Sequence, residues 1–338
     1  MQKKNPAKRR PERLVVTLLS LLFLSTAVFA TVKYVFRAPE LDTDKPVVTP
    51  DGTATSADAD RTDTDESDAP GRTRREYCYN ILVSGLDDDN GGSDTNILVR
   101  FDVPNKRIDL VSLPRDTLLH NEYRNNKLNF AYAKGGTELL MSQIENLLGV
   151  PVDFYVTVNL KGFIALVDQI DGVDFDIPIN MDYDDPYQDL HIHFTKGPRH
   201  LNGQEAMEVV RFRHNNDGTG YGTEDIGRIG TQQAFLKAVA KQLLQIGNVK
   251  NIPALVDIFY TYVKTDLTTG NLVWLGNEAL NIGTENIHFA TLPGDGSGYY
   301  NKQSVYVLDA QATCDLVNEA LNPYNEALTL EDMDILVP

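Results

Sequence analysis

The sequence predicts an α/β protein: a central mixed β-sheet flanked by helices, preceded by one transmembrane helix and a disordered linker. The sheet follows from short runs of Ile, Leu and Val that alternate with longer segments whose apolar residues recur at helical spacing. The membrane helix follows from an uncharged apolar stretch near the start, and the linker from an acidic segment with few large apolar residues. We therefore expect a basic cytoplasmic tail at residues 1–13, a transmembrane anchor at 14–36, the linker at 37–75 and a folded domain at 76–338.

The start of the chain predicts a single-pass membrane protein. The first 13 residues carry six basic side chains and one acid, and the next nineteen, Leu14–Val32, carry no charge. Such a stretch is about long enough to cross a ~30 Å hydrocarbon core as a helix. The basic flank places the N-terminus in the cytoplasm and the folded domain outside the cell. Because Val28-Phe29-Ala30 fits a small-residue cleavage site, a removed signal peptide is the alternative. Under both interpretations the rest of the chain is exported.

The linker and the overall charge limit the classes of partner. Glu40–Gly71 holds ten acids and two bases, and it lacks the apolar residues needed to offset the entropy cost of ordering. The whole chain carries a net charge of −17, so we expect no nucleic-acid partner. An anionic ligand must then be held by local arginines or by a metal ion.

The folded domain opens with three short apolar runs that are typical of buried strands: Ile81–Val83, Ile97–Phe101 and Ile108–Leu113. Later patterns predict strands at Val152–Val158, Val173–Ile177, Leu190–Phe194 and Ile287–Thr291. Helical patterns cover Thr137–Leu148 with Gly149 as its end, Leu160–Ile170, Gly230–Ile246, Ile252–Val263, Thr269–Leu280 and Asp309–Leu321. Asn202 and Glu205 are spaced as a capping box before a helix through Met207–Val210, and Gly218–Gly227 is expected to be a loop.

The first group of candidate site residues follows two of the opening strands. A loop of Asp and Gly between the first two strands contains Asp87 and Asp94, and Arg115 follows the third strand. Carboxylates are ligands that Mg²⁺ prefers, often together with substrate phosphates. Arginine offers a planar fork of donors that suits phosphate oxygens. These residue types therefore indicate a divalent-cation and phosphate site.

A second group lies in the middle of the chain. In an extended backbone Arg211 and Arg213 point to one side, because side chains alternate with period two. Arg228 stands just before the predicted helix Gly230–Ile246, where free N–H groups attract phosphate, and Gln232 is four residues further on. Any one arginine is more simply explained as a surface ion pair in an acid-rich protein. Their grouping with Arg115 at the ends of elements favours an anion-binding cradle.

These segments, taken together, resemble the LytR-CpsA-Psr family of Gram-positive cell-envelope proteins. The resemblance covers roughly residues 79–244 and rests on NILVSGLD, SDTNILV, VSLPRDT, KLNFAYAKGG, LNGQEAMEVVRFRH and DIGRIGTQQ, in the family's order. The basic tail, single anchor and exported domain also match. The resemblance implies the family's α-β-α fold and a phosphotransferase that moves a glycopolymer, such as teichoic acid or capsule, from undecaprenyl pyrophosphate to peptidoglycan through a phosphodiester.

The resemblance also implies roles for individual residues. Asp87 and Asp94 match the Mg²⁺ carboxylates, with Mn²⁺ as the alternative ion. The pyrophosphate-binding positions fall on Arg115, Arg211, Arg213, Arg228 and Gln232. Of these residues, the catalytic group would be Asp94, Arg115, Arg211 and Arg213. The acceptor hydroxyl needs a base, and either Asp94 or Asp87 could serve, directly or through bound water.

Two departures from the family pattern leave other functions open. The family often has a basic residue where this chain has Gly92 and an arginine where it has Thr231, and two loops differ in length. One alternative is a hydrolase that cleaves a polyprenyl pyrophosphate at the same site. Another is a non-catalytic protein that binds envelope polymers or lipid intermediates.

The remaining histidines and cysteines carry weaker signals. His191 and His193 lie two apart on a predicted strand and could face one way. No third metal ligand of matching spacing is evident, so we interpret them as a polar sheet face. Cys78 and Cys314 could pair in an exported protein, but the sequence does not bring them together.

Overall fold

The structure is a computed structural model that describes residues 36–41, 72–86, 92–121, 123, 125–187, 189–221, 224–245, 258 and 260–337. The expected anchor up to residue 35, most of the linker and Asp87 lie outside these residues. No helix within the described ranges is both long and apolar enough to span a bilayer. The anchor therefore stays a prediction.

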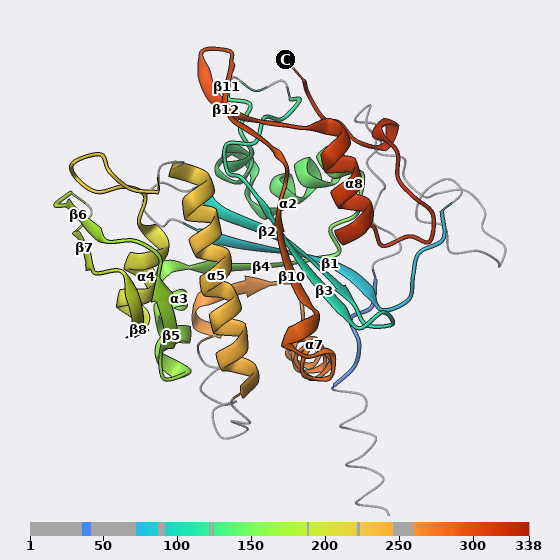
Figure 1. Ribbon diagram of the computed structural model, residues 1–338. Helices are drawn as coiled ribbons and strands as arrows, with labels where there is room; N and C mark the ends of the chain where they lie inside the picture. Colours follow the sequence, from blue (N-terminus) through green and yellow to red (C-terminus); the bar gives the residue numbers. More distant parts are fainter. Residues whose placement is uncertain are drawn as a thin grey trace, which may run out of the picture.

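Six strands of the described chain form one mixed sheet, in the order β10-β3-β2-β1-β4-β9 (Figure 1). The antiparallel centre consists of β1 (Cys78–Leu86), β2 (Ser93–Asp102) and β3 (Arg107–Leu113). Parallel strands flank it: β4 (Phe154–Asn159) beside β1 and β10 (Ile287–Thr291) beside β3. The short β9 (Val263–Thr265) pairs antiparallel with β4. The predicted mixed sheet is confirmed, with longer opening strands than predicted.

Helices cover both faces of this sheet. Alternate side chains of a strand face opposite sides, so neighbouring residues enter different cores. Leu82 lies in the core beneath α2 (Leu128–Leu148) and α8 (Ala310–Ala320). Ile81 lies in the core beneath α7 (Thr269–Ile282). The helix–sheet–helix layering predicted from the alternating pattern is therefore present.

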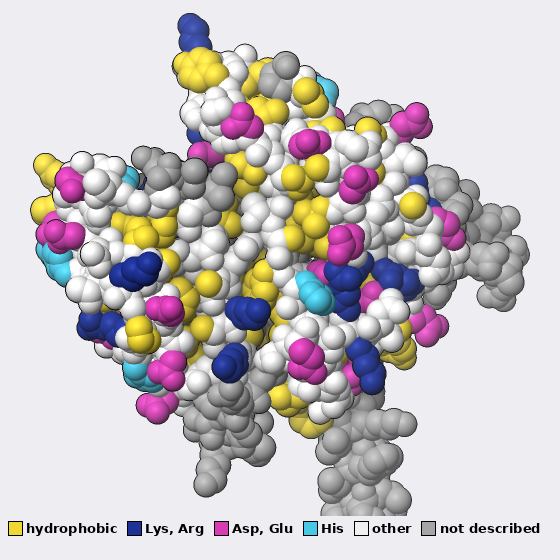
Figure 2. Space-filling view, in the orientation of Figure 1, with side chains coloured by type: hydrophobic (Ala, Val, Ile, Leu, Met, Phe, Trp, Pro, Cys, Tyr) yellow, Lys and Arg dark blue, Asp and Glu magenta, His cyan; other side chains and the backbone are white. Residues whose placement is uncertain are grey.

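A lobe stands beside the sheet and is visible as a separate mass at the left of Figure 2. It contains α3 (Leu160–Gln169) and α4 (Gly203–Arg211), and α5 (Glu224–Gln245) packs between it and the sheet. Two strand pairs complete it: β5 (Val173–Ile177) with β8 (Gly197–Leu201), and β6 (Met181–Asp185) with β7 (Leu190–Phe194). The sequence analysis predicted β5 and β7 but missed β6 and β8.

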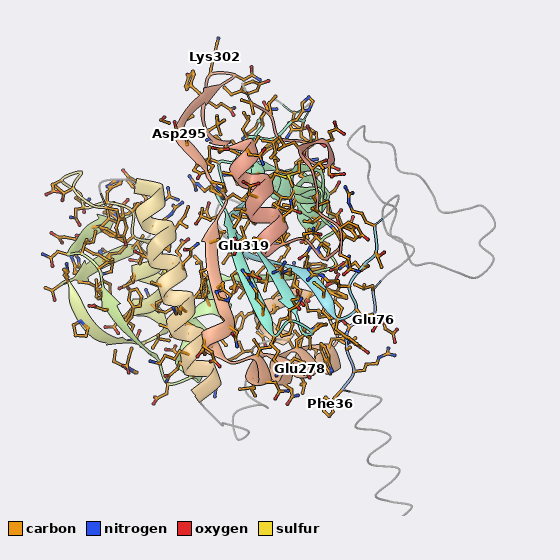
Figure 3. The ribbon with its side chains drawn as sticks, turned by 45° about the vertical axis from the view of Figure 1, so that its right-hand side comes forward. Phe36, Glu76, Glu278, Asp295, Lys302 and Glu319 are labelled. Carbon is orange, nitrogen blue, oxygen red and sulfur yellow. The ribbon has the colours of Figure 1, made fainter. Side chains whose placement is uncertain are left out.

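A second missed feature is the hairpin of β11 (Gly294–Tyr300) and β12 (Gln303–Leu308). Asp295 and Lys302 mark this hairpin in Figure 3, at the end of the molecule opposite Phe36. The described chain enters beside α7, where Asn271 Nδ2 donates to the Arg37 carbonyl at 3.1 Å. The hairpin therefore lies far from the point at which the chain leaves the expected anchor.

Helix boundaries follow their capping residues, with corrections. The predicted Asn202–Glu205 capping box, the Asp309 cap and the left-handed Gly149 are all present. However, α2 begins at Leu128 rather than Thr137, because the chain continues across a kink at Gly135 and Gly136. The predicted glycine loop is also shorter, since α5 begins at Glu224.

Two further expectations have mixed outcomes. The helix expected at Ile252–Val263 lies mostly outside the described residues, and Val263 begins strand β9.

Cys78 and Cys314 are both buried and free, so they form no disulfide. Burial raises the pKa of the Cys78 thiol to about 11, which keeps it protonated. Short 3₁₀ turns occur at Thr284–Asn286 and Leu330–Asp332.

Candidate functional site

A cavity of about 580 Å³ opens where β1 ends and β2 begins, between the sheet, the start of α2 and the lobe. Its lining includes all the described residues of the predicted cradle: Asp94, Arg115, Arg211, Arg213, Arg228 and Gln232. These residues come from three parts of the chain that are far apart in sequence. The convergence that the cradle required is therefore present in the described structure, although the loop with Asp87 lies outside it.

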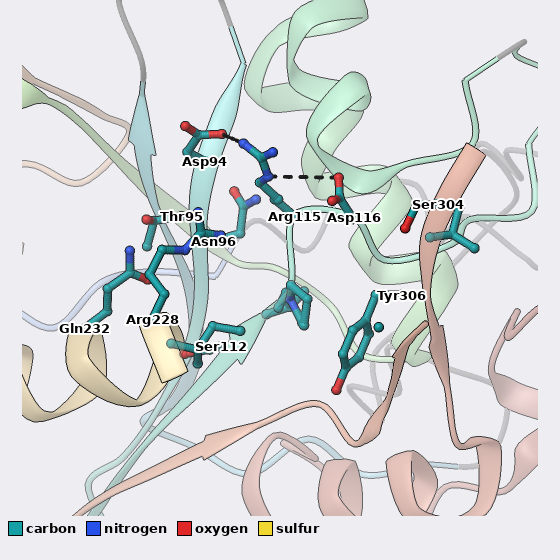
Figure 4. Close-up of a pocket in the computed structure, with 15 residues that line it drawn as sticks. Asp94, Thr95, Asn96, Ser112, Arg115, Asp116, Arg228, Gln232, Ser304 and Tyr306 are labelled. Atoms are coloured by element: carbon teal, nitrogen blue, oxygen red, sulfur yellow. Dashed lines mark hydrogen bonds and ion pairs between the residues drawn. The ribbon is translucent and has the colours of Figure 1, made fainter. Parts of the chain in front are cut away.

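The sheet supplies one side of the cavity. Asp94 lies near the start of β2, and Arg115 follows β3 after Pro114 (Figure 4). Arg115 Nη1 donates to Asp94 Oδ1 at 2.7 Å, and its Nε lies 3.9 Å from Asp116. Asp116 also pairs with Lys127 Nζ at 3.2 Å. Neighbouring acids therefore fix the Arg115 guanidinium at the cavity wall.

The lobe supplies the opposite side. Arg211 is the last residue of α4, so it is helical rather than extended as predicted. Phe212 follows in an extended conformation and is fully buried, while Arg213 is exposed. Phe212 acts as an anchor between the two arginines, and both still line the cavity. Among the described residues, Arg213 has no ion-pair partner.

The first turns of α5 supply the remaining wall. Arg228 and Gln232 lie one turn apart and both line the cavity. Gln232 Nε2 donates to the Val210 carbonyl at 3.1 Å, which fixes α5 to the end of α4. Because α5 begins at Glu224, Arg228 lies inside the helix and not just before it, as was predicted. The free N–H groups of the helix start therefore lie about one turn before it.

The two departures from the family pattern have different surroundings. Gly92 lines the cavity. Thr231 is buried behind it, with Oγ1 3.0 Å from the Tyr221 hydroxyl and 3.1 Å from the Gly227 carbonyl oxygen. Burial raises the pKa of Tyr221, whose ring packs against Phe212. Thr231 therefore supports the anchor between Arg211 and Arg213.

Sequence reasoning missed several lining residues. Tyr183 belongs to the unpredicted strand β6, and Asn129 and Phe130 belong to the unpredicted first turns of α2. His214, which directly follows Arg213, also lines the cavity and packs edge-on against Tyr183, with ring centroids 5.6 Å apart. The signal for Asn129 and Phe130 was the family segment KLNFAYAKGG, read there as a match without a role.

The donor set at the cavity fits a hard divalent cation in part. Asp94 presents a half-exposed carboxylate whose Oδ1 accepts from Arg115, and its other oxygen remains for an ion. Mg²⁺ commonly takes one or two protein carboxylates and completes its shell with water and substrate phosphates. Asp94 alone among the described acids lines this cavity, and Asp116, which lines an adjoining smaller pocket with Asp94 and Arg115, is a second described carboxylate beside it.

The charge of the cavity opposes that of the chain. Four described arginines line it, against the single carboxylate of Asp94, in a protein whose net charge is −17. Arginine remains charged at any physiological pH, so this local positive potential persists under all relevant conditions. The cavity therefore suits an anion with several oxygens, such as a diphosphate.

Comparisons with known proteins show the family to which the chain belongs. The sequence profile of the LytR-CpsA-Psr family matches residues 48–322. A polyisoprenyl-teichoic acid–peptidoglycan teichoic acid transferase, TagU of Bacillus cereus, is 32% identical over 244 residues, which is 71% of this chain and 76% of TagU. TagV of Bacillus subtilis, with the same activity in its name, is 31% identical over 70% of this chain and 61% of TagV.

A relative with a different name and a solved structure extend the comparison. The regulatory protein MsrR of Staphylococcus aureus is 29% identical over 66% of this chain and 67% of MsrR. The crystal structure of B. subtilis TagV superposes with a TM-score of 0.62 at 26% identity, covering 78% of this chain and all of that one. On these matches, together with the fold, the chain belongs to the LytR-CpsA-Psr family.

Proposed function

We propose that this protein transfers a glycopolymer from an undecaprenyl-pyrophosphate carrier to peptidoglycan. The observation that carries the proposal is the single cavity that four arginines line together with Asp94: Arg115 after β3, Arg211 and Arg213 at the end of α4, and Arg228 in α5. TagU and TagV, whose names denote teichoic acid transfer to peptidoglycan, are 32% and 31% identical to this chain, and this similarity supports the proposal. Teichoic acid or capsule polymer is the substrate class, and the cell-wall glycan is the acceptor.

The chemistry is a displacement at phosphorus. The acceptor hydroxyl attacks the phosphorus atom that carries the polymer, and a new P–O bond forms as the bond to the bridging oxygen breaks. Polyprenyl phosphate then leaves with that oxygen, and the polymer is joined to the acceptor by a phosphodiester. Such transfer depends mainly on positioning and on neutralising charge, which are tasks that arginines can perform.

Individual residues divide these tasks. Arg213, exposed to the cavity, and Arg211 beside it would hold the pyrophosphate from the lobe side. Arg115, fixed by Asp94, would hold it from the sheet side. Asp94 or Asp87 would accept the proton of the attacking hydroxyl. A bound Mg²⁺ or Mn²⁺ would supply further neutralisation of phosphate charge.

The location of the substrate calls for a membrane anchor. We propose that residues 14–36 hold the protein in the cell membrane, with residues 1–13 in the cytoplasm and the folded domain on the outer side. Residues 37–41, which pack on the folded domain beside α7, would then hold that domain close to the membrane.

Arg213 provides the test. Full-length protein in detergent micelles is given polyprenyl-pyrophosphate-linked polymer, peptidoglycan fragments and Mg²⁺, and linked product is measured. Arg213→Ala should lower the transfer rate by about 10²–10³-fold, as loss of one charge-stabilising donor does elsewhere. Arg199→Ala is the matched control, because this lobe arginine pairs with Glu205 at 2.8 Å and is not among the residues that line the cavity.

The same assay separates the rival functions. Near-parental transfer by Arg213→Ala would contradict the proposal. Polyprenyl phosphate released at equal rates with and without peptidoglycan would instead identify a hydrolase. Tight binding of the donor with no turnover, when acceptor and Mg²⁺ are both present, would identify a non-catalytic binding protein.

A further inference from the structure

The outer face of the β6–β7 pair carries a cluster of imidazoles and carboxylates away from the cavity. β6 and β7 pair in the register that sets Asp184 opposite His191 and Asp182 opposite His193. His191 Nδ1 lies 2.5 Å from Asp184 Oδ1, and His193 Nε2 lies 3.4 Å from the same oxygen. One carboxylate therefore lies between two imidazoles.

The backbone under this cluster is held from both sides. Between the two histidines Ile192 is fully buried in the lobe core, so His191 and His193 must point outward together. On the free edge of β6, the side chains of Asn215 and Asn216 accept the N–H groups of Asp182 and Asp184, at 2.7 and 2.6 Å. The aspartates and histidines are therefore presented from a fixed register, and only their side-chain torsions need to adjust.

We propose that Asp184, His191 and His193 bind a borderline divalent transition-metal ion, with Zn²⁺ as the best-fitting case. One ligand atom from each residue can be chosen so that all three lie within 4.8 Å of one another. Ligands about 2.0–2.2 Å from zinc lie roughly 3.3 Å apart in a tetrahedral shell, so small rotations of exposed side chains would close the site. Two imidazoles and one carboxylate, with water in the fourth position, is a known zinc donor set.

A comparison within the lobe separates this cluster from an ordinary ion pair. On the β5–β8 pair, Asp174 lies opposite His200 and their side chains are 2.8 Å apart. That pair has the same cross-strand geometry and a similar exposure, but among the described residues it is not part of any group of three metal-binding side chains. The β6–β7 cluster adds a second imidazole and two further carboxylates, Asp182 and Asp189. The added negative charge favours a cation over a protonated pair alone.

The site lies across one strand from the proposed catalytic cavity. Tyr183 stands between Asp182 and Asp184 on β6, and it lines that cavity beside His214. The Asn215–Asn216 segment that fixes β6 directly follows Arg213 and His214 in the chain. A metal ion on the outer face would thus brace the strand whose other face forms a cavity wall, without touching the pyrophosphate-binding residues.

The experiment titrates the full-length protein in detergent micelles with ZnCl₂ in an isothermal calorimeter. Saturation at one Zn²⁺ per chain is expected, with Co²⁺ giving the visible absorption of a low-coordinate nitrogen and oxygen site. Replacing a ligand, as in His191→Asn or His193→Asn, should weaken Zn²⁺ binding by at least about tenfold. His200→Asn is the matched control and should bind Zn²⁺ as the parent does.

A second measurement, of thermal unfolding, checks that the variants fold and that Zn²⁺ binds the folded state. Zn²⁺ should raise the thermal midpoint of the parent and of His200→Asn, but not that of His193→Asn, because a ligand stabilises only the state that binds it. The midpoints without metal should be similar, since the substituted side chains are exposed. The proposal is overturned if the parent binds no Zn²⁺ at micromolar concentrations, or if His193→Asn binds it as tightly as the parent. Neither result depends on glycopolymer transfer.

Discussion

The two ends of the β1–β2–β3 meander use arginine in opposite ways. At one end, where β2 turns into β3, Arg100 and Asp109 are almost fully buried and pair at 2.7 Å. Arg107 also donates a hydrogen bond to Asp109, and this bond raises the pKa of Arg107. At the other end, Arg115 and the lobe arginines line an open cavity with Asp94. The same residue type thus supports the fold at one end and a binding surface at the other.

The difference lies in burial and in where the guanidinium groups face. Buried charges must be matched by buried partners, because an unmatched one is costly in a low-dielectric interior. The Asp94–Arg115 pair is partly exposed, at 41% and 25%, so water can take over from either partner. In a protein with 48 acids and 31 bases, the exposed Arg213 is therefore a better indicator of a ligand than Arg100, which is buried in an acid pair.

The largest expected effect is on stability, at the buried end. Asp109→Asn leaves Arg100 buried without its counter-charge and should lower the free energy of unfolding by about 3–5 kcal/mol. Asp94→Asn is the same substitution at the cavity end and should change it by no more than about 0.5 kcal/mol. Urea denaturation followed by circular dichroism measures both. Equal losses from the two variants would remove the distinction between the ends.

The second effect is on activity. It should be large for the variant at the cavity end and small for the variant at the buried end. Asp94→Asn removes the proposed proton acceptor and cation ligand, so the transfer rate should fall by about 10²-fold or more. Asp109→Asn, assayed below its unfolding midpoint, should retain near-parental transfer per folded molecule. The measurement is product formed per unit of protein that remains folded. Full transfer by Asp94→Asn would show that the cavity end is not the reaction site.

A third prediction tests whether Arg211 depends on the cap of its own helix. The Asn202 side-chain oxygen caps α4 by accepting a hydrogen bond from the Glu205 N–H at 2.9 Å. This cap lies at the end of the helix opposite Arg211. Asn202→Ala should cost about 1 kcal/mol of stability, as loss of such a cap usually does. Transfer should change little, since Gln232 holds the other end of α4 through Val210. Gln204→Ala, on the exposed face of the same helix, is the control with no expected loss. A loss of transfer as large as that of Asp94→Asn would show that the cap sets the cavity geometry.

The sequence predicted the parts of the fold whose apolar pattern is strong. The three meander strands, β10, α3, α7 and α8 carry clear apolar patterns in the sequence, and all were placed within a few residues. Two of the missed strands, β6 and β8, bury little, whereas the missed β12 buries Val305, Tyr306 and Leu308. β6 reads MDYDD and β8 reads GPRHL, each with one well-buried side chain, so they hold too few apolar residues to stand out as strands. Cross-strand pairing holds these segments, and pairing cannot be read from one strand alone.

The sequence predicted which charged residues line the cavity, but it did not predict the other residues of the cavity wall. The arginines and Asp94 stood at element ends in recognisable segments, and the cavity does contain them. Tyr183, by contrast, depended on β6, and the third member of the His191–His193 cluster, Asp184, depended on the same missed strand. Sequence spacing offered no third ligand beside these histidines, because the register of β6 and β7 is needed to place Asp184 next to them.

The smallest expected effect is on stability and concerns the exposed pair of Asp174 and His200. Asp174 raises the pKa of His200 through a hydrogen bond at 2.8 Å. A raised pKa in the folded state means that the stabilisation is fully present below the unfolded value of about 6.5, and is lost as pH rises through the folded value. Because His200 is 57% exposed, solvent screening should keep the contribution under about 1 kcal/mol.

The measurement is a double-mutant cycle of His200→Asn and Asp174→Asn, followed by urea denaturation at pH 5.5 and pH 8.5. The coupling between the two side chains should be detectable at the lower pH and absent at the higher one, because neutral imidazole no longer attracts the carboxylate. A coupling that persists at pH 8.5 would mean that shape and packing, rather than charge, join β5 to β8. In that case, exposure alone would not explain the expected difference in stability between Asp94→Asn and Asp109→Asn.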